Sequence, residues 1–132
     1  HEMGHADLRH STRQMTQMYG IDLLASAVLG EREAIKQIST ALIGLKFSRN
    51  HEKEADDASV TYLCPTPYNA AGAAGFFEKI TAAGGARTPE FLSTHPSPDN
   101  RVENIKAKKN ELNCSGSGTY DEKYNRIKNM LP

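Results

Sequence analysis

Apolar residues recur at helical spacing along most of this chain, and no segment alternates apolar and polar residues as a half-buried strand does. The clearest run lies between residues 21 and 46, where the apolar positions are Leu24, Val28, Ile35, Ile38, Leu42 and Leu45. A period of three to four residues places such side chains along one face of a helix. The sequence therefore predicts a mainly α structure.

The composition narrows the class of protein. A chain of 132 residues with 38% hydrophobic residues and a mean hydropathy of −0.59 suits one soluble globular domain. Its most apolar stretch, residues 21–29, contains Asp22 and Ser26 and is far shorter than the ~20 residues that a membrane helix needs. Sixteen basic residues balance sixteen acidic ones, which argues against nucleic acid or anionic lipid as a partner. The oligomeric state is left open.

Glycine, proline and capping residues mark the expected helix boundaries. Gly20 favours a left-handed end to the first helix, and Gly30 an interruption of the second. The expected helices cover residues 1–19, 21–46, 49–63 after the cap Ser48, 70–83, 98–112 after the cap Ser97, and 120–131. Met15, Phe76 and Phe77 are expected to lie in the core.

The motif H-E-x-x-H at residues 1–5 predicts a metal site. On a helix, His1 and His5 lie one turn apart on the same face, with ~5–6 Å between their Cβ atoms, so both imidazoles can bind one zinc ion. Glu2 lies one residue further round the helix, where a general base can reach a zinc-bound water. The alternative is an exposed helix end with incidental histidines.

A catalytic zinc site usually has three protein ligands, so the chain must supply one more. Glu52 is the best candidate, because Glu52 and Asp56 share a face of the helix expected after Ser48. Asp56 could accept the outer N–H of a ligating histidine and hold its ring in place. His51 is a rival to Glu52, but neighbouring side chains on a helix point ~100° apart and do not easily share one ion.

Three motifs in order resemble one known family. H-E-x-G-H at residues 1–5 and E-x-x-A-D at residues 52–56 are similar to the zinc helices of gluzincin metallopeptidases of the HtpX, BepA and CAAX prenyl endopeptidase type. The segment Ser93-Thr94-His95-Pro96-Ser97-Pro98, followed by Arg101 and Val102, is similar to the His-Pro segment of the soluble, BepA-like branch. Together the motifs span residues 1–102.

This resemblance implies a zinc-dependent endopeptidase that hydrolyses polypeptides and lies in a bacterial periplasm or cell envelope. It implies one zinc ion held by His1, His5 and Glu52, with Glu2 as general base and Asp56 as support behind a ligand. The alternative function is a latent or non-enzymatic zinc-binding helical module with a chaperone or assembly role, in which His95 is the fourth ligand.

The resemblance also indicates two further candidate residues of the active site, His95 and Arg101. His95 would either occupy the fourth zinc position as a removable latch or donate a hydrogen bond to the tetrahedral intermediate. Arg101 could help with either role, or only cap and pack its helix.

The chain begins on a residue of the motif, so we expect it to be the C-terminal helical part of a longer zincin-like domain, without the upstream sheet. Residues 1–132 are expected to form a single domain fragment. Within it, residues 1–112 hold the catalytic helices and the His-Pro loop, and residues 113–132 form a connector and a short terminal helix.

The remaining candidates have plainer interpretations. His10 is expected on the surface, since it lies one and a half turns beyond His5 on another face. Glu54 and Asp57 are expected to be solvated charges. Cys64 and Cys114 either form one bridge, which would indicate an oxidising compartment, or are two unrelated buried thiols.

Overall fold

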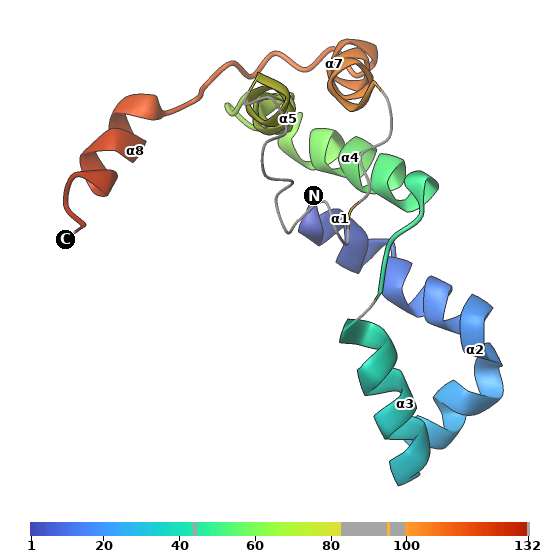
Figure 1. Cartoon of the computed structure of the whole chain (residues 1–132). Coiled ribbons are helices and arrows are strands. Elements are labelled where there is room, and N and C mark those ends of the chain that lie inside the picture. The colour runs from blue at the N-terminus through green and yellow to red at the C-terminus, as the bar shows by residue number, and fades with distance from the viewer. Residues whose placement is uncertain (44, 83–94, 96–99, 132) are drawn as a thin grey trace.

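A computed structural model describes residues 1–43, 45–82, 95 and 100–131 of the chain. Within these residues the regular structure is helical and no strand occurs, which confirms the mainly α prediction. The helices, arranged as in Figure 1, are α1 (Glu2–Asp7), α2 (His10–Val28), α3 (Arg32–Ile43), α4 (Arg49–Leu63), α5 (Gly72–Ala82), α7 (Arg101–Glu111) and α8 (Asp121–Lys128). The expected cap at Ser97 lies outside the described residues.

The prediction of one helix over residues 1–19 is wrong, because the chain breaks between α1 and α2. Arg9 adopts a left-handed conformation with φ 54° and ψ 38°, which a non-glycine residue seldom does. No glycine or proline signals this break in the sequence. Gly20 was expected to end the helix, but it forms a kink inside α2 with φ 77° and ψ 170°, which is not the left-handed helical conformation.

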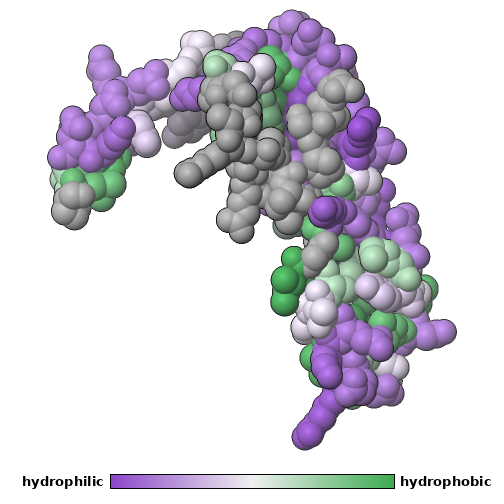
Figure 2. Space-filling view, viewed as in Figure 1, coloured by the Kyte–Doolittle hydropathy of each residue, from purple (hydrophilic) through white to green (hydrophobic). Residues whose placement is uncertain are grey.

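Helices α2 and α3 form a hairpin that projects from the rest of the molecule (Figure 1). Gly30 lies between them with φ 88°, so the predicted interruption is confirmed. Large apolar side chains remain exposed on the hairpin (Figure 2), among them Val28 and Ile43. Among the described residues, no helix has the length and apolar character needed to cross a membrane.

Helix α4 begins and ends where the sequence predicts. The Ser48 hydroxyl accepts a hydrogen bond of 3.1 Å from the backbone N–H of His51, which satisfies one of the free donors in the first turn. Glu52 follows in the same turn, where the helix dipole favours a negative charge. The cap therefore fixes the first residue of α4, and with it the position from which the buried Glu52 side chain projects.

The main core lies where α4, α5 and α7 meet. Its buried members are Val60, Ala70, Ala71, Ala74, Phe77 and Ile105. Met15 is also buried, as predicted. The prediction that Phe76 lies in this core is wrong: its side chain is 45% exposed, because the neighbouring Phe77 takes the face of α5 that turns inward.

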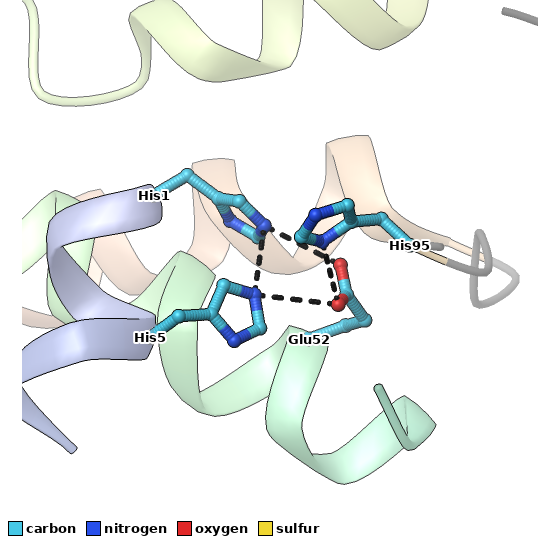
Figure 3. A group of neighbouring side chains, drawn as sticks. All are labelled: His1, His5, Glu52 and His95. Carbon is cyan, nitrogen blue, oxygen red and sulfur yellow. Dashed lines mark hydrogen bonds and ion pairs between the residues drawn. The ribbon is translucent and has the colours of Figure 1, made fainter. Parts of the chain in front are cut away.

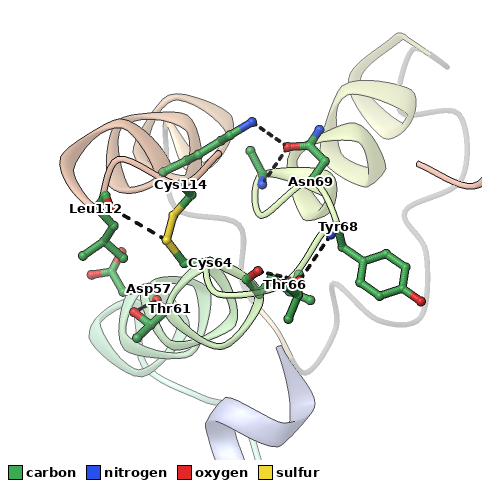
Figure 4. Close-up of a disulfide and its surroundings, with 11 residues drawn as sticks. Asp57, Thr61, Cys64, Thr66, Tyr68, Asn69, Leu112 and Cys114 are labelled. Carbon is green, nitrogen blue, oxygen red and sulfur yellow. Dashed lines mark hydrogen bonds between the residues drawn. A yellow bond between two sulfur atoms is a disulfide. The ribbon is translucent and has the colours of Figure 1, made fainter. Parts of the chain in front are cut away.

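Cys64 and Cys114 form a disulfide, which decides between the two interpretations of the sequence. Their Cα atoms are 4.9 Å apart, and the bridge ties the end of α4 to the residues that follow α7 (Figure 4). The connector after Cys114 lies against the loop after α4, since Gly118 donates to the Pro67 carbonyl and accepts from the Asn69 N–H, both at 2.9 Å. The disulfide thus links two of the helices that form the core, α4 and α7, at their C-terminal ends.

Gly4 lets α1 approach α4 closely, and Gly4→Ala is expected to lower the free energy of unfolding. An added Cβ would lie 2.9 Å from the carbonyl oxygen of Ala55 and 3.1 Å from its Cα. Overpacking of this kind costs about 1–3 kcal/mol. Urea unfolding measures the loss, with Gly75→Ala as the control, because among the described residues no atom outside its chain neighbours and its own helix backbone lies within 4 Å of the Cβ there. Equal stability of the two variants would contradict this packing.

Candidate metal centre

Four side chains from three parts of the chain converge beside α1 and α4 (Figure 3). His1 lies at the N-cap of α1 and His5 within it, Glu52 comes from the first turn of α4, and His95 from the segment between α5 and α7. Each offers one nitrogen or oxygen atom, and these atoms lie within 4.8 Å of one another. Residues 94 positions apart thus share one site.

The distances between these atoms suit a tetrahedral metal ion. Nε2 of His1 lies 3.1 Å from Nε2 of His5, and these two nitrogens lie 3.4 and 3.3 Å from the oxygens of Glu52. Zinc bonds of about 2.0–2.1 Å in tetrahedral geometry place ligand atoms about 3.3 Å apart. His95 Nδ1 is closer, at 2.9 Å from Oε1 of Glu52. The three expected ligands therefore lie at metal-site spacing.

The burial of Glu52 also fits a cation. Its side chain is fully buried, which is costly for a carboxylate that lacks a compensating charge. Among the described residues, its Oε2 has contacts with Nη2 of Arg101 at 3.1 Å and with Nε2 of His1 at 3.4 Å. Two imidazoles and a carboxylate are common zinc ligands. The residues present thus fit a zinc ion.

Asp56 and Arg101 form a buried ion pair behind His1. Nε of Arg101 donates to Oδ2 of Asp56 at 2.6 Å and Nη2 donates to Oδ1 at 2.9 Å, while Nδ1 of His1 lies 2.8 Å from Oδ1. The Arg101 guanidinium is 4.2 Å from the centroid of the Phe77 ring, so it is also a packing group of the core. The ion pair orients Asp56, and Asp56 contacts the His1 ring.

The two histidines of α1 have opposite pKa shifts. Burial lowers the pKa of His1, but its hydrogen bonds with Asp56 and Glu52 outweigh burial and raise the pKa to about 9. Burial lowers the pKa of His5 to about 4. Burial opposes ionisation of Glu52, yet its hydrogen bond with His1 and the charges of His95 and Arg101 lower its pKa overall. Around neutral pH, Glu52 is ionised and His5 is neutral, as metal ligands must be, whereas a metal that binds His1 must displace a proton from it.

Glu2 lies at the edge of this site and outside the ligand group. Its side chain is 68% exposed, and its Oε1 lies 3.7 Å from Nε2 of His95. A cavity of about 320 Å³ opens beside it, lined by His1, Glu2, Asp56, Ala73, Phe76 and Phe77. A carboxylate at the mouth of an apolar cavity is accessible to water and to a ligand.

The prediction of a surface position for His10 is wrong, since its side chain is fully buried. Its Nδ1 lies 2.9 Å from Nδ1 of His5, and its Nε2 lies 3.0 Å from Oε2 of Glu54. The surface assignment assumed a continuous helix, whereas the left-handed turn at Arg9 brings His10 back towards His5. The sequence did contain one signal for a buried His10, namely a third histidine only five residues after the H-E-x-x-H motif. The rival ligand His51 stacks on His10, with ring centroids 4.5 Å apart, and is not in the group of four.

Comparison with known proteins agrees with this geometry. The family described as Peptidase family M48 matches residues 1–109. The chain is 31% identical over 114 residues to Metalloprotease YcaL of Escherichia coli (strain K12), covering 80% of this chain and 45% of that protein. It is 32% identical over 103 residues to Mitochondrial metalloendopeptidase OMA1 of Arabidopsis thaliana, covering 76% of this chain and 21% of that protein.

A third relative is the Beta-barrel assembly-enhancing protease of Escherichia coli (strain K12), 24% identical over an alignment of 128 residues that covers 85% of this chain and 26% of that protein. The chain thus spans less than half the length of these relatives. No solved structure matches it. Because the family match covers most of the chain and includes every residue of the four-ligand group, the chain belongs to peptidase family M48.

Proposed function

We propose that this chain is the helical part of the catalytic domain of a zinc-dependent endopeptidase. The observation that carries the proposal is the convergence of His1 and His5 from α1 with Glu52 from α4, while Glu2 stays outside the ligand group. Three protein ligands with a free carboxylate nearby is the arrangement that catalytic zinc sites use. Membership of a peptidase family supports the same activity.

The residues divide into ligands, a base and supports. His1, His5 and Glu52 would hold the ion, and zinc bound there supplies Lewis acidity and lowers the pKa of water. Glu2 takes the proton from the attacking water and passes it to the leaving amine. Asp56 keeps the His1 ring aimed at the centre, and Arg101 keeps Asp56 in place.

The cavity beside Glu2 suits part of a polypeptide substrate. Its volume of about 320 Å³ and its walls of Phe76, Phe77 and Ala73 favour an apolar side chain close to the cleaved bond. His1 and Glu2 line the same cavity, so a side chain bound there would bring its own peptide bond to the base. The extended backbone of the substrate would pair with an upstream sheet edge, as expected for a zincin.

The function is tested by removing and restoring the metal in the chain extended upstream by the remainder of the domain. Treatment with a chelator is expected to abolish cleavage of denatured casein, and one equivalent of zinc is expected to restore it. Cleavage that survives complete removal of metal would contradict the proposal. Loss of cleavage that zinc does not restore would contradict zinc as the cofactor.

His95 supports a second candidate, a latent form in which four protein ligands close the site. Its ring nitrogen lies with those of His1 and His5 around Glu52. If His95 is a removable fourth ligand, His95→Ala frees that position for water, and casein cleavage is expected to rise. A fall in the cleavage rate with zinc retained would contradict the latch and indicate that His95 contacts the reacting carbonyl.

The disulfide supports a location outside a reducing cytosol. Cys64 and Cys114 are bridged, and such bridges persist in the periplasm and other oxidising compartments. With the similarity to metalloproteases of Escherichia coli, this supports the proposal of a bacterial periplasm or cell envelope. In that setting residues 1–112 would form the catalytic helices and residues 113–132 the connector and terminal helix.

A further inference from the structure

A chain of side chains, buried at His10 and partly exposed at Glu54, lies behind His5, on the side of its ring that faces away from the metal centre. We propose that His10 and Glu54 are positioning residues that hold the proton of His5 on Nδ1, so that the lone pair of Nε2 faces the ion. This inference rests on the proposed function, because it assigns to His5 the role of ligand.

The chain of contacts is continuous. Nδ1 of His5 lies 2.9 Å from Nδ1 of His10, and Nε2 of His10 lies 3.0 Å from Oε2 of Glu54. Arg13 donates to the same oxygen of Glu54 at 2.8 Å, which holds the carboxylate in place. Each contact has hydrogen-bond length, so a proton lies between each pair of atoms.

The carboxylate decides the direction of the hydrogen bond with His10, and the ligand role of His5 decides the direction of the other. Ionised Glu54 can only accept, so Nε2 of His10 donates to it. In the proposed function His5 binds the ion through Nε2, so its proton lies on Nδ1 and is donated to Nδ1 of His10. The neutral His5 ring is left with a free lone pair on Nε2, which faces Nε2 of His1 and Oε1 of Glu52 in the ligand group.

Packing fixes the two rings at these angles. His10 is fully buried and stacks on His51, with the ring planes 15° apart. The His5 ring stacks on Phe47, with centroids 4.0 Å apart. A half-turn of either ring would keep its stacked contact but would exchange ring nitrogens for carbons and lose the hydrogen bond, so stacking and hydrogen bonding together orient the imidazole of His5 before a metal binds.

The backbone is shaped to bring His10 to this place. The residue before it, Arg9, is held in the left-handed region, which is strained for a non-glycine residue and persists only when surrounding contacts enforce it. The break makes His10 the first residue of α2 and turns it towards His5. His1 is supported directly by Asp56, whereas His5 reaches its carboxylate through a second imidazole.

The test compares zinc affinities, measured by competition with a chromogenic chelator, for the chain and four variants. Loss of a group that supports a metal ligand typically weakens affinity 10- to 100-fold. We expect a fall of about 10- to 100-fold for His10→Leu, which has no acceptor. A smaller fall is expected for His10→Gln, whose amide oxygen can accept from Nδ1 of His5. Glu54→Gln is expected to fall about 10-fold, because it loses the charge that fixes the His10 proton.

Asp57→Asn is the matched control, a carboxylate changed to an amide on the same helix. Asp57 pairs with Lys53 and forms no hydrogen bond or ion pair with the histidines that the structure describes, so its variant is expected to bind zinc as the wild type does. If the wild type binds one zinc and both His10→Leu and Glu54→Gln bind it equally well, the inference is wrong and the proposed function stands. If the wild type binds no zinc, the proposed function itself fails.

A second measurement does not depend on the folding of His10→Leu. In the metal-free wild type at neutral pH, nitrogen-15 NMR of the histidine rings is expected to show His5 protonated on Nδ1. In Glu54→Gln, this preference is expected to weaken. A His5 ring protonated on Nε2 in the wild type would overturn the inference.

Discussion

Glu2→Gln is expected to keep the zinc ion and to lower the rate of peptide cleavage by about 100- to 10,000-fold, the contribution of a positioned general base. Glutamine has nearly the same shape as glutamate but cannot accept the proton of the attacking water. Glu2 lies outside the group formed by His1, His5, Glu52 and His95, so the change leaves the metal ligands intact. Casein cleavage and zinc content, measured together on the upstream-extended chain, check both parts.

His5→Ala is the companion variant for this experiment, because it removes a ligand and is expected to lose both zinc and cleavage. Glu103→Gln is the control, since it changes a carboxylate on α7 that takes no part in the ligand group. A Glu2→Gln protein that cleaves at the wild-type rate would remove Glu2 from the role of base. Loss of zinc from it would show that Glu2 holds the metal.

Replacement of the disulfide is expected to have the largest effect on stability. The bridge between Cys64 and Cys114 closes a loop with a sequence separation of 50. In the chain-entropy account, a loop of that size restricts the unfolded chain enough to contribute about 4 kcal/mol to the free energy of unfolding. The double variant Cys64→Ser, Cys114→Ser is therefore expected to unfold at a much lower urea concentration than the wild type.

The measurement is made with a chelator present, because a bound metal would add its own stabilisation to the folded state. Wild-type protein treated with a reductant is the matched control, and its unfolding curve is expected to fall close to that of the double variant. A difference below about 1 kcal/mol between the oxidised wild type and the variant would contradict the account, since the bridge would then add little.

Local signals in the sequence were enough to predict most of the helices. Ser48 predicts the start of α4 and Gly30 predicts the break before α3, because a cap and a left-handed glycine act within a few residues. The grouping of His1 and His5 follows from helical geometry alone, since residues four apart share a face. The prediction that Glu52 is the third ligand needed the second motif, E-x-x-A-D, and the resemblance to a known family.

Tertiary contacts account for what the sequence did not predict. The break at Arg9 has no local signal, since the backbone is held there by the packing of α1 on α4 and by the burial of His10. Without that break, His10 points to another face, so its contact with His5 could not be foreseen. The exposed position of Phe76 likewise depends on which of two adjacent rings α5 turns towards α7.

The central claim is that His1, His5 and Glu52 bind one zinc ion together, and zinc content by elemental analysis tests it most directly. The chain, loaded with zinc and freed of excess metal, is expected to hold one zinc ion per molecule. Glu52→Ala is expected to hold none, while Asp57→Asn on the same helix is expected to retain it. Full zinc content in Glu52→Ala, or no zinc in the wild type, would contradict the claim.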